Sequence, residues 1–267
     1  MIDKTQPAGQ QRIDALIPAG GRIYGAFAQR TGTGIKALIR LGGETLLAKA
    51  ISTLRQTEAI GNIAVVGPPS VLAEAQHAGL RIAERGSGHE NVLAGLRSLR
   101  EHVGSERVCV LSSDLPFISP AALTAFLSRC PDNEDITAAV VSKRAFETRF
   151  PSAPAVFVPL RGGAVTLGCA FVVKPDPVIR NEMYLQRAFT ARKSQWAMAR
   201  LAGGSIAARF AVRRLSHHHL AARASRVLRC SCGAAVEAPA ELAFDIDEEA
   251  DYLYAARSIS GEPQRHD

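Results

Sequence analysis

Short apolar runs alternate along the chain with stretches in which apolar residues recur at helical spacing. An apolar run that ends in a turn-forming residue is typical of a buried strand. The expected strands are residues 13–17, 63–66, 80–83, 108–111, 136–141 and 170–173. Helices are expected at residues 44–54, 71–77 and 120–129, and after a glycine-rich turn within residues 84–99. Strands that alternate with helices predict an α/β fold with a parallel sheet.

The second half of the chain is less regular. Residues 143–173 contain a predicted hairpin turn at residues 161–163. The pattern in residues 176–228 predicts mostly helices, and we expect a helical insertion at about 176–229. A short strand at residues 242–244 then leads into a helix that ends near residue 259. We predict one domain over residues 12–259, with flexible tails at residues 1–11 and 260–267.

Composition limits the class of protein. The chain has 267 residues, of which 47% are hydrophobic, so it can bury a sizeable core. No apolar run is long enough to span a bilayer, and residues 1–11 lack the apolar stretch of a secretory signal. The five cysteines are odd in number and scattered. That usage predicts reduced thiols and a cytoplasmic location.

Positive charge is concentrated in the expected helical insertion. Of the net charge of +7, a large part comes from eleven Lys and Arg residues between Arg180 and Arg229, where Glu182 is the one acid. Such a segment can attract nucleic acid, an anionic membrane surface or a phosphorylated substrate. Composition does not choose among the three.

The loop after the first strand carries the first candidate chemistry. There, Ala19 is followed by Gly20 and Gly21, which leave the backbone free at positive φ and remove side chains that would hold a ligand away. Backbone N–H groups in such a loop can bind phosphate oxygens, and Lys36 can add a full positive charge. The alternative is a tight turn with a surface lysine. The spacing is neither the dinucleotide-binding fingerprint nor a Walker A loop.

Aspartates follow two other predicted strands. Asp114 ends the apolar run 108–111, where ligands of α/β sheets bind, and a carboxylate there suits Mg²⁺. Its alternative role as a helix cap is weakened by Ser119, which can cap the next helix. Asp245 and Asp247 lie on one side of an extended backbone, so both can join Asp114 at a metal. Alternatively Asp245 faces solvent, and Asp247 caps the last helix.

These motifs together resemble the MobA-like nucleotidyltransferases. The resemblance rests on Ile17-Pro18-Ala19-Gly20-Gly21 with Lys36, on Ser112-Ser113-Asp114-Leu115-Pro116, and on Asp245-Ile246-Asp247. It implies a three-layer α/β/α fold of the nucleotide-diphospho-sugar transferase type, with a mostly parallel sheet.

The resemblance also implies roles for single residues. Pro18, Ala19, Gly20 and Gly21 would bind the nucleotide phosphates, and Gly88 and Asn91 the base. Lys36, together with Arg22 or Arg30, would offset the triphosphate charge. Asp114, Asp245 and Asp247 would hold Mg²⁺, with Asp245 preferred over Asp247. For the acceptor, the family often has Gly-Asn where this chain has Gly168-Cys169, and Arg192 and Lys193 are candidates for an acceptor phosphate.

The function that follows is Mg²⁺-dependent transfer of NMP from an NTP to a phosphorylated small molecule, with release of pyrophosphate. The acceptor would be a molybdopterin-like phosphate, a sugar phosphate or a similar compound. The residues leave the base open, and GTP is the nucleotide expected from the resemblance. One alternative is a glycosyltransferase of similar fold that uses a nucleotide sugar. Another is an inactive module whose basic helices bind nucleic acid or an anionic membrane. Metal sites at His217-His218-His219 and at Cys230 and Cys232 are disfavoured by geometry and spacing.

Overall fold

The computed structural model describes residues 12–191, 200–201 and 203–261. The predicted tail at residues 1–11 lies outside the described residues, as do residues 262–267 of the second tail. Ser260, which the sequence placed in that tail, is the last residue of helix α12.

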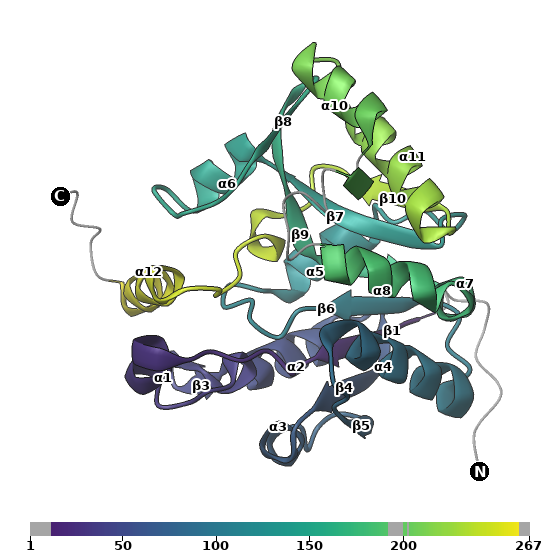
Figure 1. Cartoon of the computed structure of the whole chain (residues 1–267). Helices are drawn as coiled ribbons and strands as arrows, with labels where there is room; N and C mark the ends of the chain where they lie inside the picture. The colour runs from purple at the N-terminus through teal and green to yellow at the C-terminus, as the bar shows by residue number, and fades with distance from the viewer. Residues whose placement is uncertain (1–11, 192–199, 202, 262–267) are drawn as a thin grey trace.

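One mixed sheet of eight strands forms the centre of the molecule (Figure 1). Its order is β10-β7-β9-β6-β1-β4-β5, with β8 paired to β9. Strand β1 is parallel to both of its neighbours, whereas β9 is antiparallel to β6, β7 and β8. The strands are β1 (Ile13–Pro18), β4 (Ile60–Gly67), β5 (Leu80–Ala83), β6 (Val108–Leu111), β7 (Ile136–Ser142), β8 (Val158–Leu160), β9 (Gly163–Val173) and β10 (Cys232–Ala235). The mostly parallel sheet predicted from the sequence is confirmed.

Helices cover both faces of the sheet, as the three-layer prediction requires. Alternate residues of β1 point to opposite faces, so Ala15 and Ile17 join one core cluster and Leu16 joins the other. The first face carries α2 (Leu46–Gln56), α5 (Pro120–Leu127) and α12 (Glu249–Ser260), and the second carries α4 (Gly88–Val103) and α7 (Pro175–Arg180). The short helix α3 (Pro69–Glu74) packs on α2 and β4. Ser119 caps α5 by accepting a hydrogen bond from the Ala122 N–H, which confirms its predicted role.

Several predicted elements were wrong or incomplete. The loop between Gly21 and Lys36 contains a helix, α1 (Gly25–Thr31), and a 3₁₀ turn, η1 (Lys36–Leu38), follows it. A two-stranded ribbon, β2 (Arg40–Leu41) with β3 (Glu44–Thr45), precedes α2. Helix α6 (Lys143–Arg149) lies in the segment expected to be irregular, and β9 is longer than the expected strand at 170–173. The edge strand β10 was not predicted, and it pairs with β7.

The predicted strand at residues 242–244 does not form. A 3₁₀ turn, η2 (Ala240–Leu242), and an irregular segment occupy this region instead. Leu242, Phe244 and Ile246 are all buried, so the alternation in the sequence is real. It reflects packing onto the core, because no neighbouring strand offers a ladder of hydrogen bonds.

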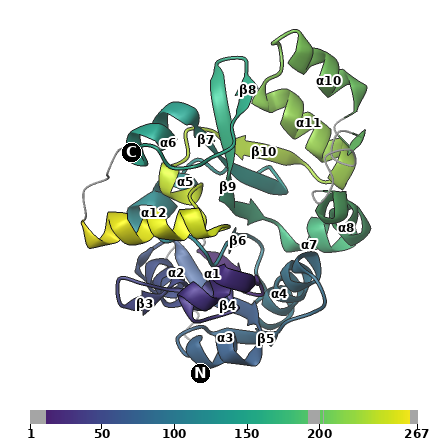
Figure 2. The ribbon, with the colours of Figure 1, turned by 60° about the vertical axis from the view of Figure 1, so that its left-hand side comes forward.

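The helical insertion consists of α7, α8 (Glu182–Ala191), α10 (Gly204–Ala211) and α11 (His217–Leu228) in the described part of the chain. Helix α8 packs on α4, and α11 packs on β10 and α8 (Figure 2). Ser216 and His219 form a reciprocal capping pair at the start of α11, so the three histidines occupy its first turn as expected.

The packing of α4 on the sheet depends on the absence of a side chain at Gly95. A Cβ added there would lie 2.2 Å from Cδ1 of Leu16, which is fully buried in β1. Helix α4 therefore approaches β1 closely, and this contact fixes the position of the start of the helix relative to the glycine turn that follows β1.

We predict that Gly95→Ala destabilises the protein although alanine favours helix formation. Overpacking of a filled core costs about 1–3 kcal/mol, which exceeds the gain of about 1 kcal/mol from helix propensity. Urea denaturation measures the difference. Gly204→Ala is the matched control, because among the described residues outside its own helix and its chain neighbours, none has an atom within 4 Å of the added Cβ. Equal stability of Gly95→Ala and the wild type would contradict the close packing.

Candidate acidic site at the strand ends

Three carboxylates from two distant parts of the sequence meet at one place. Oxygen atoms of Asp114, Asp245 and Asp247 all lie within 4.8 Å of one another. Asp114 follows β6, and the other two lie in the irregular segment before α12. The N–H of Ile246 donates to the carbonyl oxygen of Asp114 at 3.1 Å. This backbone hydrogen bond holds the two segments together, with the late aspartates on either side of its donor.

Lys36 supplies the positive charge of this cluster. Its Nζ lies 3.4 Å from Oδ2 of Asp114 and forms a second ion pair with Asp247. The side chains of Lys36 and Asp114 are 14% and 8% exposed, whereas that of Asp247 is 68% exposed. Burial by itself would lower the pKa of Lys36, but the carboxylates of Asp114 and Asp247 raise it overall. The lysine therefore stays protonated and holds the acids together.

Asp245 carries the excess negative charge of the cluster. Burial, followed by the charges of Asp114 and Asp247, raises its pKa to about 7, and Lys36 only partly opposes the shift. Cys169 in β9 lies close to Asp245, and burial, followed by the negative charge of Asp245, raises the pKa of its thiol. A site with one lysine and three acids is short of positive charge, so it favours a cation or a proton.

Two residues that were not assigned to the site support the acids. Ser112 donates its hydroxyl to Asp114, and its N–H donates to the carbonyl oxygen of Cys169 at 3.0 Å. The signals for both were present in the sequence. Ser112 lies two residues before Asp114, and Cys169 replaces the asparagine of the resembled pattern.

The glycine turn lies next to this cluster. The N–H of Lys36 donates to the carbonyl oxygen of Gly21 at 3.1 Å, and the aliphatic part of Lys36 lies beside Gly21. Pro18 ends β1, and Ala19 is fully buried with its N–H bonded to Val66. Among the described residues, no acceptor is found for the N–H groups of Gly20 and Gly21. The turn and the acids therefore share one face of the strand ends.

One of the two expected reasons for the glycines, a positive φ, was wrong. Neither Gly20 nor Gly21 has a positive φ. Gly20 is required by close approach, since a Cβ there would lie 2.7 Å from Nδ2 of Asn91 and 3.0 Å from Oε2 of Glu84. The absence of a side chain, and not left-handed backbone freedom, lets the start of α4 reach the turn.

Both candidate arginines form ion pairs with glutamates that lie outside the cluster of three aspartates. Arg22 donates to the carbonyl oxygen of Gly20 at 2.6 Å and pairs with Glu84 at 2.5 Å. Arg30 pairs with Glu249 on α12. Arg22 therefore lies at the glycine turn, and Arg30 joins α1 to α12.

Gly88 and Asn91 both belong to the first turns of α4. Gly88 is its first residue, after the N-cap Ser87. Asn91 is buried, and its Oδ1 accepts a hydrogen bond from the N–H of Arg85 at 2.6 Å. The amide oxygen of Asn91 thus holds the preceding loop, and a role of either residue in base binding stays a prediction.

Of the three predicted acceptor residues, the structure describes only Gly168. Gly168 is buried in β9, and a Cβ there would lie 2.8 Å from Cβ of Ala139 and 3.0 Å from the carbonyl oxygen of Leu242. Close packing between β7, β9 and η2 therefore explains this glycine. Arg192 and Lys193 lie outside the described residues, so their role stays a prediction.

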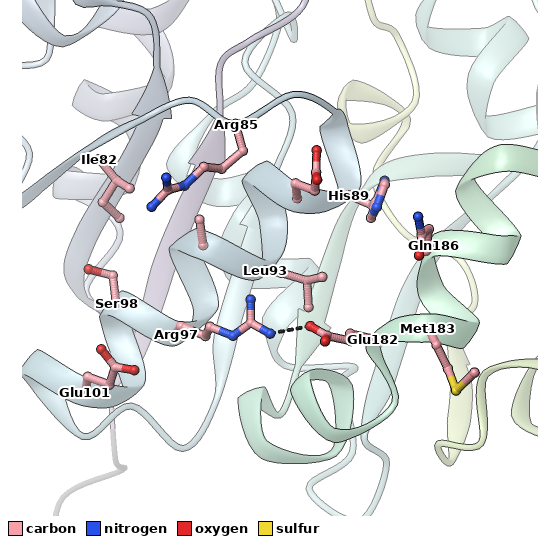
Figure 3. Close-up of a pocket in the computed structure, with 12 residues that line it drawn as sticks. Ile82, Arg85, His89, Leu93, Arg97, Ser98, Glu101, Glu182, Met183 and Gln186 are labelled. Carbon is pink, nitrogen blue, oxygen red and sulfur yellow. Dashed lines mark hydrogen bonds and ion pairs between the residues drawn. The ribbon is translucent and has the colours of Figure 1, made fainter.

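A cavity of about 660 Å³ lies between α4 and α8 (Figure 3). Arg97 reaches across it to form an ion pair with Glu182. Other lining side chains, such as Arg85, Glu90 and Glu101, are also charged. Among the described residues that were predicted to act in the site, none lines this cavity, so we place it outside the site.

The donor set of the acidic cluster fits a divalent cation. Carboxylate oxygens are the ligands that Mg²⁺ and similar hard cations prefer. The cluster has three acids and one lysine, so its excess negative charge gives such an ion a favourable place to bind. Asp114, Asp245 and Asp247 are the residues that would hold it.

Comparison with known proteins identifies relatives that match most of the chain. The sequence profile of the family described as "MobA-like NTP transferase domain" matches residues 15–231. The structure of a hypothetical transferase from Thermus thermophilus is 30% identical, with a TM-score of 0.79, over 90% of this chain and 99% of the other. The fold is also that of 2-C-methyl-D-erythritol 4-phosphate cytidylyltransferase from Thermus thermophilus, at 16% identity and a TM-score of 0.56, over 93% and 99% of the chains.

A curated relative matches locally. The 2-C-methyl-D-erythritol 4-phosphate cytidylyltransferase of Frankia casuarinae is 34% identical over 96 residues, which is 35% of this chain. The match spans about a third of the length of that relative, 34%. Among the described helices, none combines the length and apolar character needed to cross a membrane.

We predict that Asp245→Asn gains stability over the wild type as pH rises from 5 to 8 in metal-free buffer. An unfolded aspartate has lost its proton at about pH 4, whereas folded Asp245 keeps it up to about pH 7. The free energy of unfolding of the wild type therefore falls across this window by roughly 1–3 kcal/mol relative to that of the asparagine variant.

Urea denaturation with EDTA at several pH values measures this difference. Asp245→Ala is the matched control, because it also removes the carboxyl group and should show the same trend. If the difference in stability between wild type and variant stays constant from pH 5 to 8, the pKa of Asp245 is not raised in the folded protein.

Proposed function

This chain belongs to the MobA-like NTP transferase domain family, and from that premise we propose a specific nucleotidyl transfer. An oxygen of a phosphorylated small-molecule acceptor attacks the α-phosphorus of an NTP. The bond from that phosphorus to the oxygen bridging to the β-phosphate breaks, and its electron pair leaves with pyrophosphate. The acceptor then carries the NMP group.

One observation carries this proposal: Lys36 links the glycine turn to the acids. Its backbone N–H is bonded to Gly21, and its ammonium group lies between Asp114 and Asp247. Phosphates bound by the N–H groups of Gly20 and Gly21 would therefore lie beside both a positive charge and a cation-binding cluster. A triphosphate is the ligand that needs both.

The chain's own residues would act by positioning and by charge. Gly20 and Gly21 would orient phosphate oxygens through their N–H groups, and Lys36 would neutralise part of their charge. Arg22, at the same turn, would assist if its pair with Glu84 opened. Mg²⁺, held by Asp114 and Asp245 with Asp247 beside them, would supply further charge neutralisation at the α-phosphate when bound.

We propose a sugar phosphate, a polyol phosphate or a similar small molecule as the acceptor. Support comes from the cytidylyltransferases of methylerythritol phosphate that this chain is similar to, one locally in sequence and one in fold. Cys169 lies beside Asp245, at the position where the resembled pattern has an asparagine, so the chain differs in the acceptor half. This difference favours an acceptor other than that of the family pattern.

A glycosyltransferase that uses a nucleotide sugar would have the same fold. The two reactions differ in their product, because nucleotidyl transfer releases pyrophosphate and glycosyl transfer releases a nucleoside diphosphate. The product formed from an NTP or a nucleotide sugar therefore separates them.

We predict that Asp114→Asn loses nucleotidyl transfer while it stays folded. Removal of one such electrostatic group costs on the order of 10²–10³ in rate. Wild type and variant are first screened for thermal stabilisation by each of the four NTPs with Mg²⁺. Pyrophosphate release is then measured with the stabilising NTP and a panel of sugar and polyol phosphates.

Asp132→Asn is the matched control, because Asp132 is an exposed acid that pairs with Arg107 outside the acidic cluster. It should keep wild-type turnover. Full turnover in Asp114→Asn would end the proposed role of the acidic cluster. A wild-type protein that is stabilised by no NTP would end the proposed reaction.

A further inference from the structure

A second feature lies at the end of the molecule formed by the β8–β9 hairpin and α10. We define the apical patch as Val158, Arg161, Phe210, Val212, Arg213 and Arg214. The N–H of Arg161 in the hairpin turn donates to the carbonyl oxygen of Leu215 at 2.6 Å, which joins the hairpin to the segment after α10. Both views show the hairpin and α10 at the same end of the molecule (Figures 1 and 2).

The apolar side chains of the apical patch are unusually exposed. Phe210 is 48% exposed, Val212 is 63% exposed and Val158 is 41% exposed. Single exposed apolar residues are ordinary, but several gathered at one end of a domain indicate a contact surface. Ile206 and Leu215, on either side of Phe210 in the sequence, are buried, so this segment is anchored while its tip faces outward.

The charge of the apical patch has one sign. Arg161, Arg213 and Arg214 have no acidic partner among the described residues. The sequence from Met183 to Val236 contains no Asp or Glu. A partner of this surface must therefore offer negative charge together with a place for apolar side chains.

The apical patch is connected to the acidic site by β9. Ala170 pairs with Leu111 at the end of β6, so the earlier residues of β9 extend past the strand end that precedes Asp114. Cys169 contacts Asp245, and Gly163 begins the strand at the hairpin turn. Gly163 and Cys169 are six steps apart along the strand, which corresponds to about 20 Å of extended chain. A surface bound at the patch would therefore lie beyond the same strand ends as the acidic site.

We propose that the apical patch docks this enzyme on an anionic lipid bilayer. The arginines are attracted to anionic headgroups, and Phe210 and Val212 enter the interfacial layer. A second copy of the chain is a poorer partner, because two such patches facing each other across a two-fold axis would repel. The docking does not depend on the reaction proposed above.

Vesicle co-sedimentation of the full chain tests the proposal. Vesicles of phosphatidylcholine are compared with vesicles that also contain phosphatidylglycerol, at low and high salt. We expect binding only to the anionic vesicles, with loss at high salt. Arg213→Asn with Arg214→Gln should weaken binding by about fivefold per arginine. Asparagine tolerates the left-handed conformation of Arg213, whose φ is 55°.

Phe210→Ser with Val212→Ser should weaken binding at least tenfold without a change in charge. Arg55→Gln with Arg81→Gln removes the same charge elsewhere on the surface, and Val103→Ser removes an exposed apolar side chain from the end of α4. Both controls should bind like the wild type. All patch variants should keep the stabilisation by NTP, which separates this test from that of the reaction.

Three results would overturn the proposal. Equal binding to neutral and anionic vesicles would remove the role of the arginines. Binding to single-stranded oligonucleotides without binding to vesicles would assign the patch to nucleic acid. A dimer in light scattering that the Phe210→Ser and Val212→Ser changes convert to a monomer would assign it to a second copy.

Discussion

The mutual repulsion of three carboxylates held at one point is the constraint on which the rest of the site depends. Asp114 cannot move away, because its carbonyl oxygen is bonded to Ile246 and its side chain accepts from Ser112. Lys36 balances part of the charge, but burial, followed by the charges of Asp114 and Asp247, still raises the pKa of Asp245. The folded chain thus stores unfavourable electrostatic energy that a cation or a proton relieves. Such an arrangement is costly for stability and useful for binding.

Close packing helps to set the position of the glycine turn relative to α4. Gly95 lets α4 approach Leu16 in β1, and Gly20 lets the start of α4 approach the turn. Glu84 and Asn91 come close to Gly20 as a result, and Arg22 pairs with Glu84. Two glycines far apart in the sequence therefore set one geometry. Neither uses a positive φ, so their role is visible only in the distances to neighbouring atoms.

Prediction from the sequence succeeded where a strong local pattern coincided with a strand end. The apolar runs before Pro18 and Asp114 placed both residues at the edge of the sheet where ligands of α/β proteins bind. The spacing of Asp245 and Asp247 and the family resemblance both pointed to these two acids, which the structure brings to Asp114. Prediction failed for residues 242–246, where alternate residues are buried as they would be in a strand, but the backbone forms no strand. It also failed where a helix forms in a glycine-rich segment, as in α1.

The sequence by itself determined the class of fold, the identity of the family, and the lysine and three aspartates that the structure brings together. These follow from periodicity and from motifs that are local in the chain. The tertiary structure decided which charges face each other: Lys36 lies between Asp114 and Asp247, while Arg22 and Arg30 pair with other acids. It also decided that Cys169 meets Asp245 and that exposed apolar residues gather with arginines at one end. Electrostatic pairing depends on distances between segments far apart in sequence, and those distances are fixed only when the core packs.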